Sequence, residues 1–538
     1  MSPPLMRQSS QPEWDPRRQG RRLLSLFVDV RDGEVAPLAH AFCAFFCILF
    51  AYNLLLPLRD DAGVSLGTNF LPTLFLMSLG AAVIAAPVAA SFVSRPGLAK
   101  ERAVSQLYYA VGSLLLVFYL LYTAASIGGN GAGSTGSAPG LESGREQVVQ
   151  GEGMALGDSG KDDGAPVDRE NPADGAGGSQ GAEDAVRNGD AHMTMMGRSL
   201  RVCLFLWVGV QNLVALSTMW ARCADIFTSD AGARLFGFIG AGGTLGQLAG
   251  SATARAVALR LAMGGQSGNQ GAAGPPPYQL ILLSSFFLFC TGWLASHLRG
   301  GQPHGGHKAK GIPQEGSGAS GRSYVSRLWE GFALIAASPY LLHLCGYLVL
   351  NYSVASLFYF EKSLIVAMSV KDSNSRAAWF ATVNMYSGAI IAVIQLTVTG
   401  RVIKYLGMPC SLAITPFICT LVQLLVSWSP IPDMIAGAEV GRKVLTYAIS
   451  RPAREALFTV VSQEERYKAK ICIDTVIQRL GDSAGAMIFQ VVEGFLALGA
   501  HSVASWGSLA CVAWCISAYT LGMKNQTLAA AAAAAAGG

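Results

Sequence analysis

Two stretches near the end of the 538-residue sequence carry ionisable side chains at helical spacing inside apolar surroundings. In the first stretch, Glu439 lies three residues before Arg442 and four before Lys443, so a helix places all three on one side. A charge at the bilayer centre costs about 2.5–3.5 kcal/mol on insertion scales. We therefore expect these side chains to face one another or a hydrated path instead of lipid.

The second stretch forms a polar stripe with a period of about one helical turn. Its members are Lys470, Asp474, Gln478 and Asp482, with Arg479 one turn before the last. One interpretation is structural ion pairing that fixes helix register, and the other is a substrate or proton path. In the second interpretation, cations hold an anionic group and a carboxylate couples protons. The substrate and coupling candidates are Glu439, Arg442, Lys443, Lys470, Asp474, Arg479 and Asp482.

Two pairs of opposite charge lie nearer the N-terminus. Arg59 and Asp60 end the first apolar stretch, and Arg222 and Asp225 follow the fourth. Such pairs are candidates for salt bridges that gate a path at the membrane face. The alternative interpretation is a plain interfacial anchor.

A series of small residues occupies the fifth apolar stretch, at Gly242, Gly246 and Gly250. The spacing of four lays them along one helix face and lets another backbone approach closely. Tight helix packing is the first interpretation. A contact that slides during transport would use the same surface.

The composition indicates a membrane protein. Hydrophobic residues make up 51% of the chain and charged residues 14%, against roughly 25% charged in a soluble domain. Apolar stretches of about 20 residues are long enough to cross roughly 30 Å of hydrocarbon, and they must be helical to satisfy their own backbone groups. The sequence therefore predicts an all-α membrane protein with about twelve transmembrane helices in two six-helix bundles.

The predicted spans alternate with polar segments of several kinds. They run near residues 35–56, 70–93, 104–126, 202–219, 235–258, 278–297, 339–360, 378–399, 408–428, 434–447, 471–498 and 503–521. The resulting organisation is a cytoplasmic segment at 1–34, an N-terminal bundle at 35–298, a cytoplasmic linker at 299–325, a C-terminal bundle at 326–524 and a low-complexity tail at 525–538. The acidic, Gly-rich insert at 127–197 is expected to be a disordered, non-cytoplasmic loop.

Lys and Arg near the span ends predict the orientation. With the N-terminus in the cytoplasm, that side receives most of them, including the cluster at 451–470. The opposite side, apart from the long loop, receives chiefly Arg59, Arg260, Lys362, Lys371 and Arg376. The asymmetry is about fourfold, so both termini are expected to be cytoplasmic in a multi-pass protein. The orientation leaves open which membrane the protein occupies.

Several function classes lack support in the sequence. The eleven cysteines form no CxxC pair, and His304 and His307 read as part of a solvated linker, so we expect no metal and no cofactor. No phosphate loop, HExxH or credible GxSxG occurs, so we expect no enzyme. The basic residues form no stripe with interleaved aromatics, so we expect no nucleic-acid partner. The expected partners are the lipid bilayer and a small anionic solute, with a monomer as the expected state.

Three stretches are similar to a known transporter family. They are YNLLLPLRDDAGV at 52–64, WARCADIFTSDAGARLFGFIGAGGTLG at 220–246 and YAISRPAREALFTVVSQEERYKAKICIDTVIQRLGDSAGA at 447–486. They resemble the non-mitochondrial ATP/ADP antiporters of plastids and intracellular bacteria, together with their bacterial major-facilitator relatives. The resemblance covers most of 27–524 except the two inserts. It implies a major-facilitator-like fold and transport of an organic anion by exchange.

The sequence departs from the nucleotide exchangers at two positions. They carry a lysine after the Arg-Asp pair of the first span, where this chain has Asp61 and Ala62. They carry Gly-Lys-Ser in the eleventh span, where this chain has Gly481, Asp482 and Ser483. Phosphates call for cations. We therefore expect a secondary carrier of a small organic anion working by alternating access, with a true ATP/ADP exchanger as one alternative and a non-transporting scaffold or receptor as the other.

Overall fold

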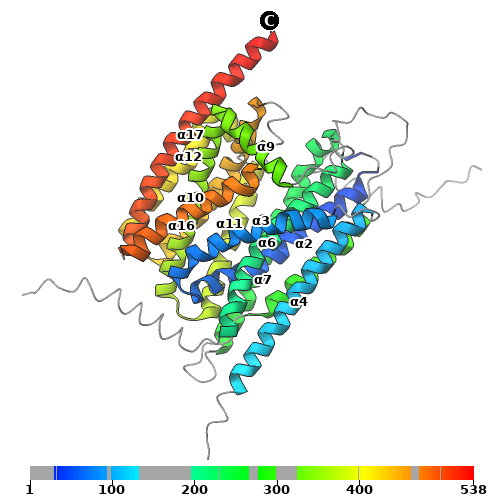
Figure 1. Ribbon diagram of the computed structural model, residues 1–538, viewed down its shortest axis with the longest axis vertical. Coiled ribbons are helices and arrows are strands. Elements are labelled where there is room, and N and C mark those ends of the chain that lie inside the picture. Colours follow the sequence, from blue (N-terminus) through cyan, green and yellow to red (C-terminus); the bar gives the residue numbers. More distant parts are fainter. Residues whose placement is uncertain are drawn as a thin grey trace, which may run out of the picture.

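The chain folds as a set of long helices. The computed structural model describes residues 30–31, 33–93, 99–131, 195–227, 229–265, 277–298, 324–397, 399–461, 472–496 and 498–537. All regular structure in these residues is helical, and the helices pass one another as tilted rods (Figure 1). Nine of the helices within these ranges are long and apolar enough to cross a bilayer. The predicted all-α membrane fold is confirmed.

Six long helices form the first half of the chain, in the predicted order. They are α2 (Val35–Ser65), α3 (Leu71–Val93), α4 (Lys100–Gly131), α6 (Met195–Ile226), α7 (Ser229–Gly265) and α8 (Gln279–His297), with the short turn η1 (Thr68–Phe70) between α2 and α3. Nearly all of the predicted linker at 299–325, most of the loop at 127–197 and nearly all of the segment at 1–34 lie outside the described residues.

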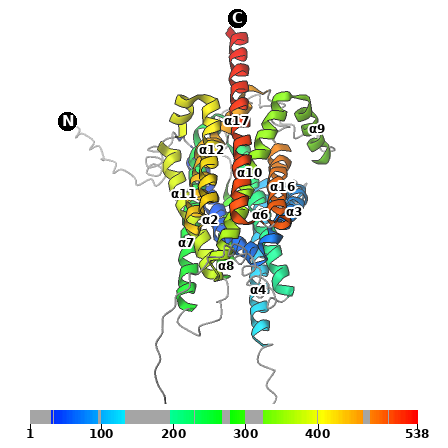
Figure 2. The ribbon, with the colours of Figure 1, turned by 90° about the vertical axis from the view of Figure 1, so that its left-hand side faces the viewer.

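The second half begins with the short helix α9 (Tyr324–Ala337), followed by α10 (Pro339–Ser369), α11 (Ser373–Thr397) and α12 (Thr399–Trp428). The tenth span is interrupted. It comprises α13 (Pro432–Leu445), the π-turn η2 (Thr446–Ser450), α14 (Arg451–Leu457) and η3 (Phe458–Val460). The eleventh comprises the π-turn η4 (Ile473–Ile477), α16 (Gln478–Phe489) and the π-turn η5 (Gln490–Phe495). The last helix, α17 (Gly499–Gly537), lies along α10 and α12 and continues through the alanine run (Figure 2).

Local sequence signals set where helices α10 and α13 begin. The Ser338 hydroxyl caps α10 by accepting a hydrogen bond from the backbone N–H of Leu341, and Pro339 follows in the first turn. Helix α13 likewise begins with a proline and carries Asp433 in its first turn, where a negative charge suits the helix dipole. Both helices are therefore started by their own sequence.

Helix α10 extends well past the predicted end of the seventh span at residue 360, and it places Lys362 inside the protein. The Lys362 side chain is only 4% exposed. The expectation that Lys362 belongs to a loop on the non-cytoplasmic side is therefore wrong. Hydropathy ended the span early because two charged residues follow Phe360.

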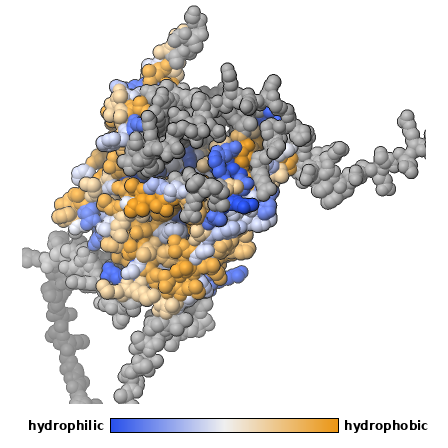
Figure 3. Space-filling model, turned by 45° about the vertical axis from the view of Figure 1, so that its right-hand side comes forward, coloured by the Kyte–Doolittle hydropathy of each residue, from blue (hydrophilic) through white to orange (hydrophobic). Residues whose placement is uncertain are grey.

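Each half has its own apolar core. One core is built mainly from α2, α4, α6, α7 and α8, and includes Phe45, Tyr108 and Val208. The other is built mainly from α10, α12, α16 and α17, and includes Tyr347 and Trp514. The outer faces expose large apolar side chains, and a broad apolar area covers the middle of the face in Figure 3. Such surfaces suit contact with lipid.

The glycine series brings α7 against the backbone of α2. A Cβ atom at Gly242 would lie 2.5 Å from the carbonyl oxygen of Phe42, and one at Gly246 would overlap that of Phe46. At Gly250 the same atom would lie 2.6 Å from the Phe50 carbonyl oxygen. Three successive turns of the two helices therefore touch along their backbones, and only glycine fits there.

Candidate functional site

A network of buried ion pairs joins the two halves of the chain. On α2, the Asp60 carboxylate pairs with Arg59, at 2.7 Å between Oδ1 and Nη2. Its other oxygen lies 3.8 Å from Nζ of Lys362 on α10. The same ammonium lies 3.8 Å from Oε1 of Glu439 on α13. Lys362 therefore links an acid of the first half to an acid of the second.

Glu439 is the centre of the second-half part of the network. Its Oε2 lies 2.9 Å from Nη2 of Arg442 and its Oε1 lies 3.2 Å from Nζ of Lys443. Lys443 also donates to the side-chain oxygen of Asn384 on α11, at 2.7 Å. The structure thus brings together Glu439, Arg442 and Lys443 as the spacing predicted, and adds contacts from α10 and α11 that spacing could not supply.

The network holds more positive than negative charge. Four cations, Arg59, Lys362, Arg442 and Lys443, share the two carboxylates of Asp60 and Glu439. Both acids are 3% exposed, whereas the side chains of Arg442 and Lys443 keep 13% and 17% of their surface exposed. Because buried charge must be balanced, this surplus of about two positive charges favours an anionic ligand.

Aromatic rings line the network. The Tyr359 hydroxyl donates to Oδ1 of Asp60 at 3.2 Å. The same ring lies 4.9 Å from Nζ of Lys362 and 5.5 Å from the Arg59 guanidinium carbon, and Arg442 lies 5.6 Å from the Phe358 ring. Rings at these distances stabilise cations and restrict the space around them.

A separate ion pair joins the halves at the C-terminal end of α2. Asp61 Oδ1 lies 2.7 Å from Nε of Arg376 on α11, and the Ser373 hydroxyl donates to Asp61 Oδ2 at 2.5 Å. Arg376 also donates to the Ser65 hydroxyl and to the backbone oxygen of Lys371. Neighbouring acids on α2 therefore have different partners: Asp60 is part of the network, and Asp61 links α2 to α11.

The predicted polar stripe of the eleventh span is only partly described. Arg479 and Asp482 pair with each other, at 3.4 Å between Nη1 and Oδ2, and their side chains are 20% and 16% exposed. Asp482 also lies within electrostatic range of Arg59. Asp474 lies in η4, but its side chain is outside the described atoms, as is the whole of Lys470.

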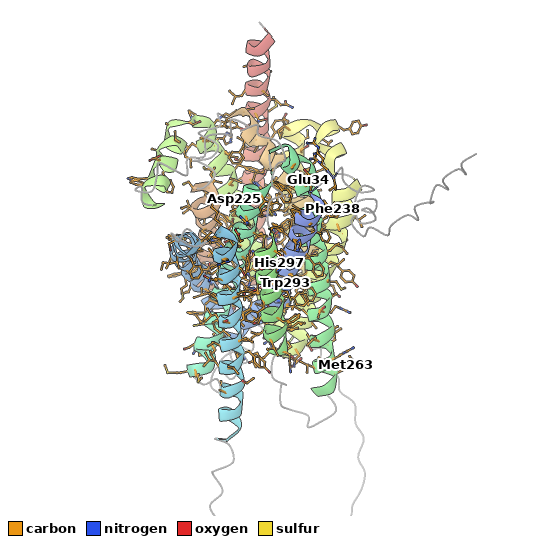
Figure 4. The ribbon with its side chains drawn as sticks, turned by 90° about the vertical axis from the view of Figure 1, so that its right-hand side faces the viewer. Glu34, Asp225, Phe238, Met263, Trp293 and His297 are labelled. Atoms are coloured by element: carbon orange, nitrogen blue, oxygen red, sulfur yellow. The ribbon has the colours of Figure 1, made fainter. Side chains whose placement is uncertain are left out.

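The other two gate candidates lie apart from the network. Arg222 donates to the backbone oxygen of Leu298 and lies 3.6 Å from Glu101. Asp225 pairs with Lys100 at 3.2 Å. These partners all belong to the first half. Figure 4 places Asp225 and Glu34 toward one end of the molecule, nearest the C-terminal end of α17, and Met263 toward the other.

Sequence reasoning missed three contributors: Lys362, Tyr359 and Asn384. Their partners are far away in the chain, since Tyr359 and Asp60 are separated by 299 positions. One available signal was the Glu361-Lys362 pair, because charged residues directly after a long apolar run can lie inside the helix.

These observations define a polytopic helical membrane protein with a buried, cation-rich ion network where its halves meet. No family model matches the chain. Two relatives are ADP,ATP carrier protein 1 of Chlamydia pneumoniae, 25% identical over 194 residues, and of Chlamydia muridarum, 26% identical over 182. The alignments cover 32% and 30% of this chain, and 38% and 34% of those carriers. The predicted resemblance to ATP/ADP antiporters is confirmed at this level of sequence identity.

Solved transporters have a comparable outline. The nucleoside transporter NupG has a TM-score of 0.47 and 12% identity, covering 93% of this chain and 99% of its own. The D-xylose-proton symporter has a TM-score of 0.48 and 10% identity, covering 90% and 97%.

Proposed function

We propose that this protein is a secondary carrier that moves a small organic anion by alternating access in a major-facilitator-like arrangement. The observation that carries the proposal is the surplus of about two positive charges in the buried network. Arg59, Lys362, Arg442 and Lys443 would hold the anion. Asp60 and Glu439 would hold those cations in place when the anion is absent.

The location of the network supports alternating access. It is shared between α2 on one side and α10 and α13 on the other, so an anion bound there would contact both halves. The Asp61–Arg376 pair would close one end, and separating it would open that end. Rocking of two bundles around a central site is the general mechanism for folds of this kind.

The charge balance favours an anion with about two negative charges over a free nucleoside triphosphate. The alternative, a true ATP/ADP exchanger, draws support from the relatives, which are ADP,ATP carriers. The two proposals differ in one measurable way. An ATP/ADP exchanger requires nucleotide on both sides, whereas a dianion carrier accepts dicarboxylates or phosphate esters.

Purified protein in liposomes tests the proposal by uptake of labelled dicarboxylates, phosphate monoesters, ADP and ATP. We expect saturable uptake of at least one dianion. Arg442→Gln should lower this uptake by about tenfold or more, the equivalent of about 1.4 kcal/mol or more. The matched control is Arg260→Gln, an exposed arginine on α7 that should leave uptake unchanged. Uptake of no solute, or full uptake by the Arg442 variant, would overturn the proposal.

We also propose that both termini face the cytoplasm, which places the Asp61–Arg376 closure at the opposite end. The support is the distribution of Lys and Arg along the chain. A protease-cleavable tag at each terminus tests it in sealed cells. Cleavage of either tag by protease added outside the cells would contradict this orientation.

A further inference from the structure

Two adjacent residues of α10 face different surroundings. Successive residues of an α-helix point about 100° apart. Lys362 points toward Asp60 and Glu439, in the network between the halves. Glu361 instead points into the second half, where it meets Gln423 of α12. The ion network and a second buried acid are therefore attached to the same turn of one helix.

Glu361 is a buried carboxyl group with a neutral partner. Both Glu361 and Gln423 are 0% exposed. The Gln423 amide nitrogen lies 2.7 Å from Oε2 of Glu361, while Oε1 of Glu361 and Oε1 of Gln423 have no hydrogen-bond partner among the described atoms. An ionised carboxylate only accepts hydrogen bonds, and burying one without a cation is costly. A proton on Glu361 removes that cost.

The Gln423 side chain can serve both protonation states. A separation of 2.7 Å suits an amide N–H donating to a carboxylate. It equally suits a carboxylic O–H donating to the amide oxygen after the amide turns over. The pair therefore provides a partner for Glu361 with and without its proton, which a site for reversible proton binding needs.

Other ionisable groups lie near this acid and near the network. From α17, Cys511 lies within electrostatic range of both Glu361 and Arg442. From α12, Cys419 lies within range of Arg442 and Glu439. On α10 itself, Lys362 is the next residue. An anion that neutralises Arg442 and Lys362 would make the potential at Glu361 more negative, so anion binding and proton binding favour each other.

We infer that Glu361 is a proton-binding site whose proton is carried together with the anion, with Gln423 as its positioning residue. The inference rests on the proposed carrier function. Its consequence is symport: the anion and the proton bind cooperatively to one state and leave cooperatively from the other. Replacing Glu361 by glutamine should leave exchange of the anion intact while removing the dependence on a proton gradient.

The first test needs no transport. The infrared spectrum of the purified protein at neutral pH should contain the carbonyl-stretch band of a protonated carboxylic acid, and Glu361→Gln should remove it. Gln423→Leu should keep the band and move it to higher frequency, because the group loses its hydrogen bond. A band that is unchanged in Glu361→Gln would show that Glu361 does not hold the proton, and would overturn the inference.

The second test uses liposomes with an imposed pH gradient. One pH unit can drive at most about tenfold accumulation per coupled proton. We expect gradient-driven accumulation in the unmodified protein, its loss in Glu361→Gln with exchange still within about twofold of the original, and its retention in the control Glu101→Gln. Accumulation that persists in Glu361→Gln would overturn the coupling. Absence of all anion flux would instead overturn the carrier proposal, while the infrared band still decides where the proton is.

Discussion

The ion pairs within the first half and the network between the halves use the same residue types in opposite ways. Lys100 pairs with Asp225 at 63% and 39% exposure, and Arg234 pairs with Glu34 at 19% and 20%. The network between the halves is buried and has more cations than acids. Ion pairs that are open to water contribute little and fix local geometry, whereas a buried network with surplus positive charge favours an added anion.

The difference also separates stability from function. A balanced pair gains nothing from a bound anion, and its loss affects only the contact that it makes. Loss of an acid from the network has wider effects, because each of its acids pairs with several cations. Substitutions in the two regions should therefore differ in size and in kind.

The largest expected effect is that of Glu439→Gln. It leaves Arg442, Lys443 and Lys362 without their shared acid, and breaking a buried pair costs about 3–5 kcal/mol. Thermal unfolding in detergent should show a large decrease in the melting temperature. The matched change Glu34→Gln, in a first-half pair, should cost about 1 kcal/mol or less. Equal decreases for the two variants would remove the distinction between the regions.

Lys362→Met should affect binding more than folding. The network keeps three cations for two acids, so we expect the fold to survive. Loss of one charged hydrogen bond of about 1.5–3 kcal/mol should weaken anion binding by roughly 10- to 150-fold. Equilibrium binding of the labelled anion measures this, with the exposed Lys524→Met as the control. Unchanged affinity in Lys362→Met would place the anion elsewhere.

Asp61→Asn should loosen the closure at the end of α2. Losing the contacts to Arg376 and Ser373 should shift the balance between closed and open ends by about 1–3 kcal/mol. Hydrogen exchange of the backbone at residues 370–376 should become faster. Asp433→Asn, an exposed acid at the start of α13, should leave that exchange unchanged. Unaltered exchange in Asp61→Asn would show that this pair does not hold the end closed.

The smallest effect is expected for Asp225→Asn. Its pair with Lys100 is well exposed, so its removal should change the free energy of unfolding by about 1 kcal/mol or less. The difference should shrink further in high salt, since screening weakens exposed pairs, and anion affinity should not change. A clear loss of anion affinity would give this first-half pair a role in the path.

The sequence predicted the helices well because bilayer thickness imposes a long apolar pattern. It predicted Glu439, Arg442 and Lys443 as one group because their contacts are local to a helix turn. It missed Lys362 because the helix end was set by hydropathy. It missed Tyr359 because its partner, Asp60, depends on how the halves pack. It missed Asn384 because its partner, Lys443, lies on another helix of the same half, 59 positions away. The π-turns of the tenth and eleventh spans left no signal in the apolar pattern.

The glycine contacts between α2 and α7 have a consequence for motion. Helices that touch along three successive turns of backbone cannot slide or rotate past each other without losing that fit. Asp60 and Asp61 on α2 therefore travel with α7, whose Arg255 donates to the Thr382 hydroxyl on α11 at 2.9 Å. If the two halves rock apart as proposed, the Asp61–Arg376 and Arg255–Thr382 contacts should part in a single concerted step.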